Sequence, residues 1–321
     1  MEKITIGQTD LKVGRINLGG NVFGWTLDEA ASFEILDAFV GRGYNFIDTA
    51  DVYSVWGGPN NKGGESETII GKWMKARGNR DQIILATKVG WDFKDGRKGL
   101  KASYIHQAAA DSLRRLQTDY IDLYYNHIDT GEVPLEESLG AFQDLVKSGK
   151  VRYMAASNVP ADRLKRSLEM AKSGDFPRYH ALQPHYNLVE RKKYESNYAD
   201  LVNEYALTVF PYWSLAAGFL TGKYRFEGDL GKSTRGGDAK KYLTPEGLGV
   251  LDALDKVAAK HGSAPASVAL AWLLNQPGIG APIASATKLA QLETLFAAPE
   301  LAKVLDKEDL ALLDQRSQSF A

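Results

Sequence analysis

Short apolar runs recur along the chain at near-regular intervals, and most of them end on polar or aromatic side chains. They cover residues 15–19, 45–48, 82–88, 121–127, 151–157, 180–183, 207–213 and 280–285. Between them lie segments with helical spacing of apolar residues, such as Leu135, Leu139, Phe142 and Val146. Strands that alternate with helices in this way form a parallel sheet, and repetition of the unit predicts a closed (β/α)8 TIM barrel in the α/β class.

The other elements follow from turn and capping residues. Helices are predicted over 27–40, 65–77, 103–116, 134–149, 161–173, 194–204, 245–260, 265–275, 289–297 and near 307–315, the last being an extra C-terminal helix. Asp28 and Ser103 are expected to cap the first and third of these helices. Residues 2–7 and 11–16 flank a short polar turn and predict an N-terminal β-hairpin over one end of the barrel. Residues 216–243 form the longest irregular segment, and with no linker in sight we expect one domain over 1–321.

Composition narrows the classes of function. The formal net charge is -1, which gives no reason to expect nucleic acid or an anionic membrane as a partner. The chain has no cysteine, which excludes disulfides, thiolate catalysis and Cys-ligated metals, and no other spacing predicts a metal site. No run approaches the length of a membrane span, and the N-terminus lacks an apolar signal region. We therefore expect a cytoplasmic protein, either a monomer or a weak homo-oligomer.

Four side chains at or near neighbouring strand ends are candidates for proton-transfer chemistry. Asp48, Lys88 and His127 end three successive strands, and Tyr53 follows the first of these. The C-terminal strand ends of such barrels form the active site. A tyrosine can donate a proton to a developing alkoxide, and a nearby lysine would lower its pKa from about 10. Each residue also has a structural interpretation: a turn aspartate, a loop aromatic, a solvated lysine and a core histidine.

Six ordered motifs make the chain similar to a known family. The stretches NFIDTADVYS, ILATKVG, YIDLYYNHID, AASN, LQPHYNLVER and AAGFLTGKY resemble the aldo-keto reductase superfamily over essentially the whole chain. The resemblance implies a (β/α)8 barrel that transfers a hydride between NADPH and a carbonyl or alcohol. It assigns the family's catalytic roles to Asp48, Tyr53, Lys88 and His127. The GFLTGKY-like loop is similar to that of bacterial branches, which include relatives of the potassium-channel β subunit.

The same resemblance implies a cofactor site for NADP, with NAD as the alternative. No GxGxxG follows a strand, so a Rossmann site is not supported. Ser157, Asn158 and Gln183 are expected at the nicotinamide carboxamide. Trp213 is expected to stack on the nicotinamide ring, where many relatives have tyrosine. The rest of the expected set comprises Gly20, Asp48, Ser214, Leu215, Gly218, Lys223, Ser285, Ala286, Thr287, Lys288 and Gln291. Many relatives have a basic residue at the position of Thr287 and asparagine at that of Leu295, which leaves the preference between NADP and NAD open.

The substrate side is expected to be aromatic and open. Trp25, Tyr53, Trp56, Trp91 and His127 are predicted to surround a small-molecule carbonyl or alcohol. The chain ends soon after the eighth helix, so the long C-terminal loop of steroid and aldose reductases is not expected. Two other functions stay open: a redox-sensing regulatory subunit that binds NADP and turns over slowly, and a non-redox enzyme that uses Lys88 as a Schiff-base nucleophile.

Overall fold

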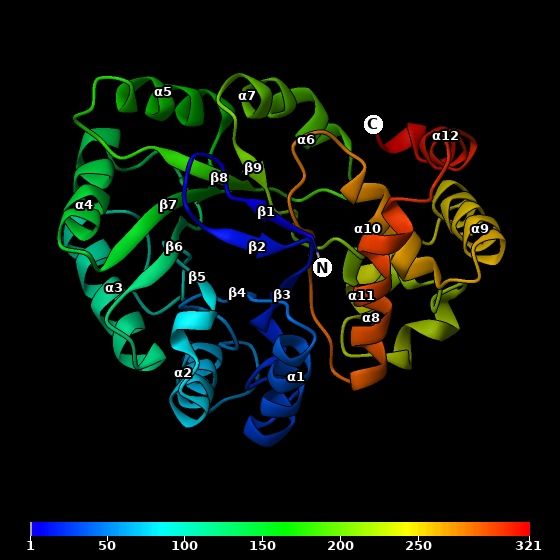
Figure 1. The fold of residues 1–321 in the computed structure, drawn as a ribbon, viewed down its shortest axis with the longest axis horizontal. Helices are drawn as coiled ribbons and strands as arrows, with labels where there is room; N and C mark the ends of the chain where they lie inside the picture. The colour runs from blue at the N-terminus through cyan, green and yellow to red at the C-terminus, as the bar shows by residue number, and fades with distance from the viewer. Residues whose placement is uncertain (1) are drawn as a thin grey trace.

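The computed structural model describes residues 2–321, and its centre is a ring of eight parallel strands (Figure 1). Their order is β10-β3-β4-β5-β6-β7-β8-β9. The bounds are β3 Asn17–Gly19, β4 Phe46–Asp48, β5 Ile84–Val89, β6 Ile121–Asn126, β7 Val151–Ser157, β8 Tyr179–Gln183, β9 Thr208–Val209 and β10 Ile283–Ala284. The N–H of Val209 donates to the carbonyl of Gly278 at 2.9 Å, and that of Ile283 donates to Pro211 at 2.9 Å. These bonds close the ring, which confirms the predicted (β/α)8 barrel.

Alternate residues of each strand point into the barrel or out toward the helices. One buried cluster holds Phe46, Ala86, Leu123, Tyr125, Ala155, Ala181 and Phe210, which fill the interior. Intervening residues such as Ile47, Leu85 and Tyr124 belong to the larger cluster between strands and helices. Because side chains alternate along a strand, the residue two positions after an interior residue also faces inward. This rule places the side chains of Asp48 and Lys88 inside the barrel, near the C-terminal ends of β4 and β5.

The N-terminal hairpin closes the barrel at the N-terminal ends of its strands, as predicted. β1 (Lys3–Thr5) pairs antiparallel with β2 (Lys12–Gly14), and Figure 1 shows both in front of the strands. Ile6, Leu11 and Val13 are fully buried and pack on the interior cluster. Apolar burial of this kind contributes about 1.5–3 kcal/mol for each large side chain.

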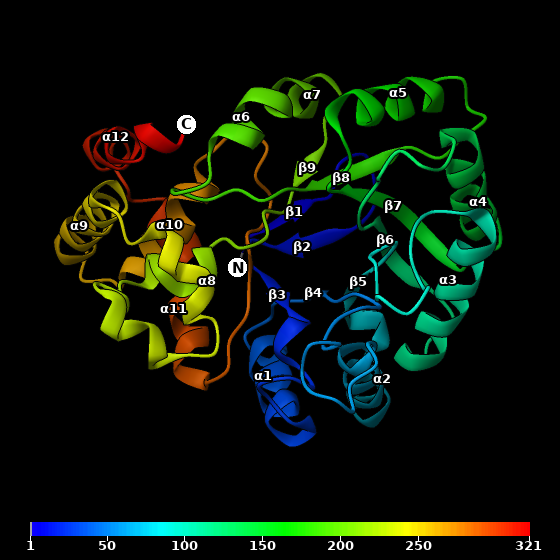
Figure 2. The same ribbon diagram turned by 180° about the vertical axis from the view of Figure 1, so that it is seen from behind.

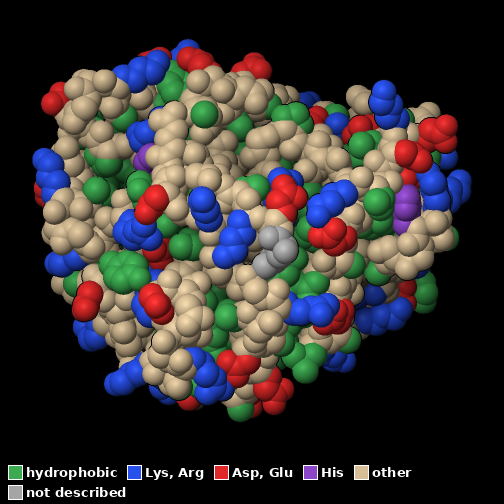
Figure 3. Space-filling view, viewed as in Figure 1, with side chains coloured by type: hydrophobic (Ala, Val, Ile, Leu, Met, Phe, Trp, Pro, Cys, Tyr) green, Lys and Arg blue, Asp and Glu red, His purple; other side chains and the backbone are tan. Residues whose placement is uncertain are grey.

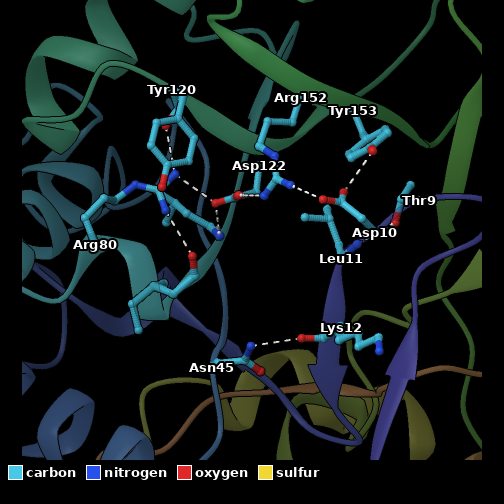
Figure 4. A network of polar contacts seen from close by, with 12 residues as sticks. Thr9, Asp10, Leu11, Lys12, Asn45, Arg80, Tyr120, Asp122, Arg152 and Tyr153 are labelled. Carbon is cyan, nitrogen blue, oxygen red and sulfur yellow. Dashed lines mark hydrogen bonds and ion pairs between the residues drawn. The ribbon is translucent and has the colours of Figure 1, made fainter.

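A polar network ties the hairpin to the strands (Figure 4). The carboxylate of Asp122 accepts from Arg80 at 2.8 Å and from Arg152 at 2.8 Å, and also from the N–H of Leu85 at 3.0 Å. Arg152 continues to Asp10 in the hairpin at 2.7 Å. Figure 3 shows the molecule from the side seen in Figure 1, with positive and negative side chains interspersed over the surface. Asp122 is 1% exposed, so its carboxylate depends on these donors in place of water.

Helices cover the outside of the barrel, close to the predicted ranges. Their bounds are α1 Glu29–Gly41, α2 Glu65–Arg77, α3 Ala102–Leu116, α4 Leu135–Lys147, α5 Ala161–Ala171, α6 Lys192–Asn197, α7 Ala199–Glu204, α8 Gly236–Ala239, α9 Pro245–Lys260, α10 Pro265–Leu274, α11 Leu289–Ala302 and α12 Lys307–Arg316. Asp28 caps α1 by accepting from the N–H of Ala31, as predicted. The predicted Ser103 cap is wrong, because α3 begins at Ala102, whose N–H is bound by the side chain of Glu137.

Two other helices differ from prediction for tertiary reasons. The single helix expected over 194–204 is divided into α6 and α7 at Tyr198, whose hydroxyl donates to the carbonyl of Val159 at 2.9 Å. α11 continues past the predicted end and includes Pro299, because Pro299 and Leu301 pack into the core.

The long irregular segment after β9 consists mostly of short helices. It contains η3 (Ala216–Thr221), η4 (Glu227–Lys232), α8 and η5 (Lys240–Tyr242). Figure 2, seen from behind, shows this yellow-green segment beside α10 and α11. Among residues 2–321, no helix has both the length and the apolar content needed to cross a membrane.

Candidate active site

Lys88 lies at the centre of a buried cluster at the upper end of β5. Its ammonium donates to the carboxylate of Asp48, to the carbonyl of Thr49 at 2.8 Å and to the hydroxyl of Tyr53 at 2.9 Å. An ammonium has three N–H donors, so all of them are used. The side chains of Lys88 and Asp48 are both 0% exposed. The structure thus brings together three of the four residues that the sequence assigns to catalysis.

Burial and charge act in opposite directions on this cluster. Burial lowers the pKa of Lys88, but the adjacent Asp48 and Tyr53 more than compensate, and the net pKa lies above the usual value. Burial raises the pKa of Asp48 more than the Lys88 ammonium lowers it, so its net pKa also lies above the usual value. Each group is the counter-charge that the other needs where water is absent.

The pKa of Tyr53 differs from the sequence-based expectation. Lys88 does lower it, as expected, but burial raises it more, so the net pKa lies above the usual value near 10. The expectation counted the ammonium and left out the loss of water around the phenol. Tyr53 is therefore protonated at neutral pH and can act as a proton donor.

His127 follows β6 and faces the same site. Its ring centroid lies 6.2 Å from that of Tyr53 and 5.0 Å from that of Trp91. Burial lowers the pKa of His127 well below its usual value, and the charge of Lys88 lowers it further. The imidazole is therefore neutral. Its Nδ1 atom is buried and has no hydrogen-bond partner within residues 2–321.

Aromatic side chains surround Tyr53, as expected for the substrate side. The ring centroids of Trp25 and Trp56 lie 5.9 Å apart, and those of Trp56 and Tyr53 lie 6.0 Å apart. Trp56 is 45% exposed and Trp91 is 40% exposed, although both are large and apolar. Exposed aromatic surface beside a buried polar cluster is typical of a small-molecule site.

The first group of expected cofactor residues is continuous with the Lys88 cluster. Gln183 donates through Nε2 to the second carboxylate oxygen of Asp48 at 2.8 Å. Ser157 donates to the carbonyl of Gln183 at 2.9 Å, and Asn158 donates to the Ser157 hydroxyl at 3.1 Å. These contacts join residues of β4, β7 and β8 in one network.

Tyr212 joins this network, and sequence reasoning did not include it. Its hydroxyl donates to Oδ1 of Asn158 at 2.9 Å, and its ring stacks on that of His185 with centroids 5.2 Å apart. Phe210 points into the barrel. Because side chains alternate along an extended segment, Tyr212 is the next residue expected to point inward, and Trp213 is expected to point the other way. Counting the alternation from Phe210 would have identified Tyr212. Trp213 has a left-handed backbone, with φ 54°, and its carbonyl accepts from Asn187.

The remaining cofactor candidates form two further groups. Ser214, Leu215, Gly218 and Lys223 lie in the turns after β9, where the ammonium of Lys223 lies 4.9 Å from the ring centroid of Tyr224. Ser285, Ala286, Thr287, Lys288 and Gln291 lie after β10. They precede or start α11, which begins at Leu289 with Lys288 as its N-cap. Ser285 contacts the side chain of Asn21, a residue next to Gly20 that the sequence did not single out.

Comparison with known proteins now identifies the family. A model of the aldo/keto reductase family matches residues 15–318. The chain belongs to the aldo-keto reductase family. It is therefore an oxidoreductase of a family that uses NAD(P)H, which confirms the resemblance seen in the sequence.

Three similar proteins illustrate the range of this family. "Aldo-keto reductase YhdN" of Bacillus subtilis is 36% identical, over 92% of this chain and 88% of its own. "Aldo-keto reductase yakc [NADP(+)]" of Schizosaccharomyces pombe is 31% identical, over 84% of this chain and 78% of its own. A "probable voltage-gated potassium channel subunit beta" of rice, Oryza sativa, is 29% identical, over 99% of this chain and 97% of its own.

The residues of this aldo-keto reductase fit a dinucleotide with a pyrophosphate. Gly218 adopts φ 89°, and a Cβ there would lie 2.9 Å from the Lys223 ammonium. The left-handed backbone at Gly218 favours glycine beside that cation. Gly20 is buried against Ser66, and a Cβ there would lie 2.9 Å from its hydroxyl. A glycine beside a cation, as at Gly218 and Lys223, suits close approach by a phosphate.

Proposed function

We propose that this aldo-keto reductase reduces aldehydes or ketones with NADPH, and oxidises the corresponding alcohols in reverse. The observation that supports this most is the buried contact of Lys88 with Asp48 and Tyr53. It supplies a protonated phenol, a cation that tunes it and a carboxylate that neutralises the cation. Such an arrangement suits proton transfer to a carbonyl oxygen.

Tyr53 acts as the proton donor in this proposal. Its oxygen accepts a hydrogen bond from Lys88, so its own O–H proton is available to a substrate oxygen. The neutral imidazole of His127 hydrogen-bonds the same oxygen and orients it. In the reverse direction, Lys88 stabilises the phenolate that Tyr53 needs as a base. When bound, the nicotinamide cofactor supplies or accepts the hydride.

We place the nicotinamide end of the cofactor near Ser157, Asn158 and Gln183. Tyr212 is our candidate for the stacking platform in place of Trp213, because it lies in the inward register and bonds Asn158. Lys223, Thr287 and Lys288 are proposed for the phosphates. The name of the S. pombe relative supports NADP as the preferred cofactor.

Two alternatives remain for comparison. The name of the rice relative supports a regulatory subunit, which we would expect to bind NADP and turn over slowly. Slow turnover with every aldehyde tested, together with tight NADPH binding, would favour it. A Schiff-base role for Lys88 is less well supported, because a raised pKa keeps the amine protonated and therefore non-nucleophilic.

The test of the proposal is Tyr53→Phe, assayed by NADPH oxidation with 4-nitrobenzaldehyde. We expect kcat to fall by about 10²–10⁴-fold, the usual contribution of general acid catalysis, while NADPH still quenches tryptophan fluorescence. Tyr124→Phe is the matched control, because Tyr124 is fully buried with an unpartnered hydroxyl on the outer face of β6. Full activity of Tyr53→Phe would rule out its role as proton donor.

A further inference from the structure

Arg235 lies beside the aromatic wall of the active site. It comes between η4 and α8, in the segment that sequence reasoning treated as irregular. Its guanidinium carbon lies 5.2 Å from the ring centroid of Trp25. Trp25 contacts Trp56, which contacts Tyr53, so two aromatic rings connect the cation to the proposed proton donor.

Within the part of the chain that the structure describes, the guanidinium of Arg235 forms no ion pair. Within residues 2–321, every other arginine that is at least partly buried has a hydrogen bond or an ion pair. In the same segment, Arg225 binds both carboxylate oxygens of Asp255 at 2.8 Å. Arg235 is half-buried over the face of Trp25, and its guanidinium makes no hydrogen bond to another side chain or carbonyl within residues 2–321.

Electrostatics are consistent with a cation directed at the site. Burial lowers the pKa of Arg235, which is the cost of removing the charge from water, and the Tyr53 phenolate and Asp238 oppose that shift. The charge of Arg235 in turn contributes to lowering the pKa of Tyr53. The two groups are therefore within electrostatic reach, and a partly desolvated arginine binds a carboxylate more strongly than an exposed one.

We infer that Arg235 selects substrates whose carbonyl is accompanied by a carboxylate. This inference rests on the proposed carbonyl reduction at Tyr53. The carbonyl oxygen would lie at Tyr53 and His127, the body of the substrate against Trp25 and Trp56, and the carboxylate at Arg235. Acidic aldehydes and ketones are thus the substrate class that this pocket fits.

The test compares aldehydes that are matched in size but differ in charge. One pair is 4-carboxybenzaldehyde and 4-nitrobenzaldehyde, and the other is succinic semialdehyde and butanal. For each pair, the ratio of kcat/KM for the acidic to the neutral member is measured with NADPH. Arg235→Leu should lower this ratio by about 10- to 100-fold in at least one pair, as expected for a charge-assisted hydrogen bond. Arg235→Lys should restore part of it.

Lys240→Met is the matched control, because it removes an exposed cation that pairs with Glu227 in the same segment. It should leave the ratio at the wild-type value. Added salt should lower the ratio in wild-type protein, since salt screens the attraction of the carboxylate to the cation. That second measurement needs no variant, so it still decides the question if Arg235→Leu fails to fold.

Three results would overturn the inference. The ratio could be unchanged in Arg235→Leu for both pairs, or it could be insensitive to salt in wild-type protein. Alternatively, Arg235→Leu could weaken NADPH binding, measured by fluorescence, without changing the ratio, which would assign Arg235 to the cofactor pyrophosphate. Failure of the proposed function looks different, because the wild-type protein would then reduce neither the acidic nor the neutral aldehydes.

Discussion

The buried pair of Lys88 and Asp48 predicts a strong and unusual coupling in stability. Both side chains are 0% exposed. In Asp48→Asn, the ammonium still has the Thr49 carbonyl and the Tyr53 hydroxyl as acceptors, but no negative charge remains beside it. Leaving one partner of a buried pair uncompensated costs about 3–5 kcal/mol. Lys88→Met should cost a similar amount, because Asp48 then keeps only Gln183.

The double variant is the informative one. When both charges are removed, no ion remains buried, so Asp48→Asn combined with Lys88→Met should cost no more than either change alone. The coupling energy between the two sites should then be about 3 kcal/mol. Urea unfolding followed by tryptophan fluorescence measures all four free energies of unfolding. Arg42 and Glu293 form an exposed pair, 56% and 64% exposed, and the same cycle there should give less than about 1 kcal/mol.

The pH dependence of the same variants has a defined sign. In wild-type protein the folded pKa of Lys88 is raised, so its stabilisation is complete below the unfolded value near 10.4 and is lost as pH rises through the folded value. Without Asp48, burial dominates and the folded pKa falls below the unfolded one. The destabilisation by Asp48→Asn should therefore be largest near neutral pH and shrink toward about pH 10. Additive single changes, or a penalty that grows with pH, would refute this account of the pair.

Three other predictions follow from single side chains. Asp122→Ala should lower the free energy of unfolding by about 2–4 kcal/mol, because Arg80 and Arg152 lose their buried partner. Asp10 is exposed, so Asp10→Ala should lower it by less than about 1 kcal/mol when both variants are unfolded in urea. The pH profile of kcat/KM should show no ionisation from His127 between about pH 6 and 7.5, because its pKa is well below 6.5; a limb there that His127→Gln removes would contradict this. Tyr212→Ala should raise the Kd for NADPH about tenfold while Trp213→Ala changes it less, and the reverse order would return the stacking role to Trp213.

The barrel could be predicted because its strands are short, buried and regularly spaced. The C-terminal ends of two strands could be predicted as well, because Asp48 and Lys88 are charged residues at the end of apolar runs. The division at Tyr198 could not be predicted, because it depends on a hydrogen bond to Val159, which is far away in the sequence. No glycine or proline marks that position. Local patterns thus determine the element types, and tertiary contacts adjust their ends.

The candidate site shows the same division between periodic and irregular segments. Residues on strands can be assigned to the barrel interior by counting alternate positions. Counting from Phe210 would have assigned Tyr212 in this way. The cluster at Lys88 was foreseeable because a buried ammonium needs a counter-charge, and Asp48 ends the neighbouring strand. The net pKa of Tyr53 could not be foreseen, because the burial of its phenol depends on the loops that cover it.

Arg235 represents the part that only the fold could supply. It has no periodic neighbours, and its segment contains Gly, Lys and Asp in no repeating order. Nothing in that stretch distinguishes Arg235 from Arg225, yet one pairs with Asp255 at 2.8 Å and the other contacts Trp25, more than two hundred residues away in the chain. The strands of this barrel therefore carry the chemistry common to the family, while its irregular segment carries the charge that we expect to select the substrate. Substrate preference should accordingly change with substitutions in 216–243 more readily than the reaction itself does.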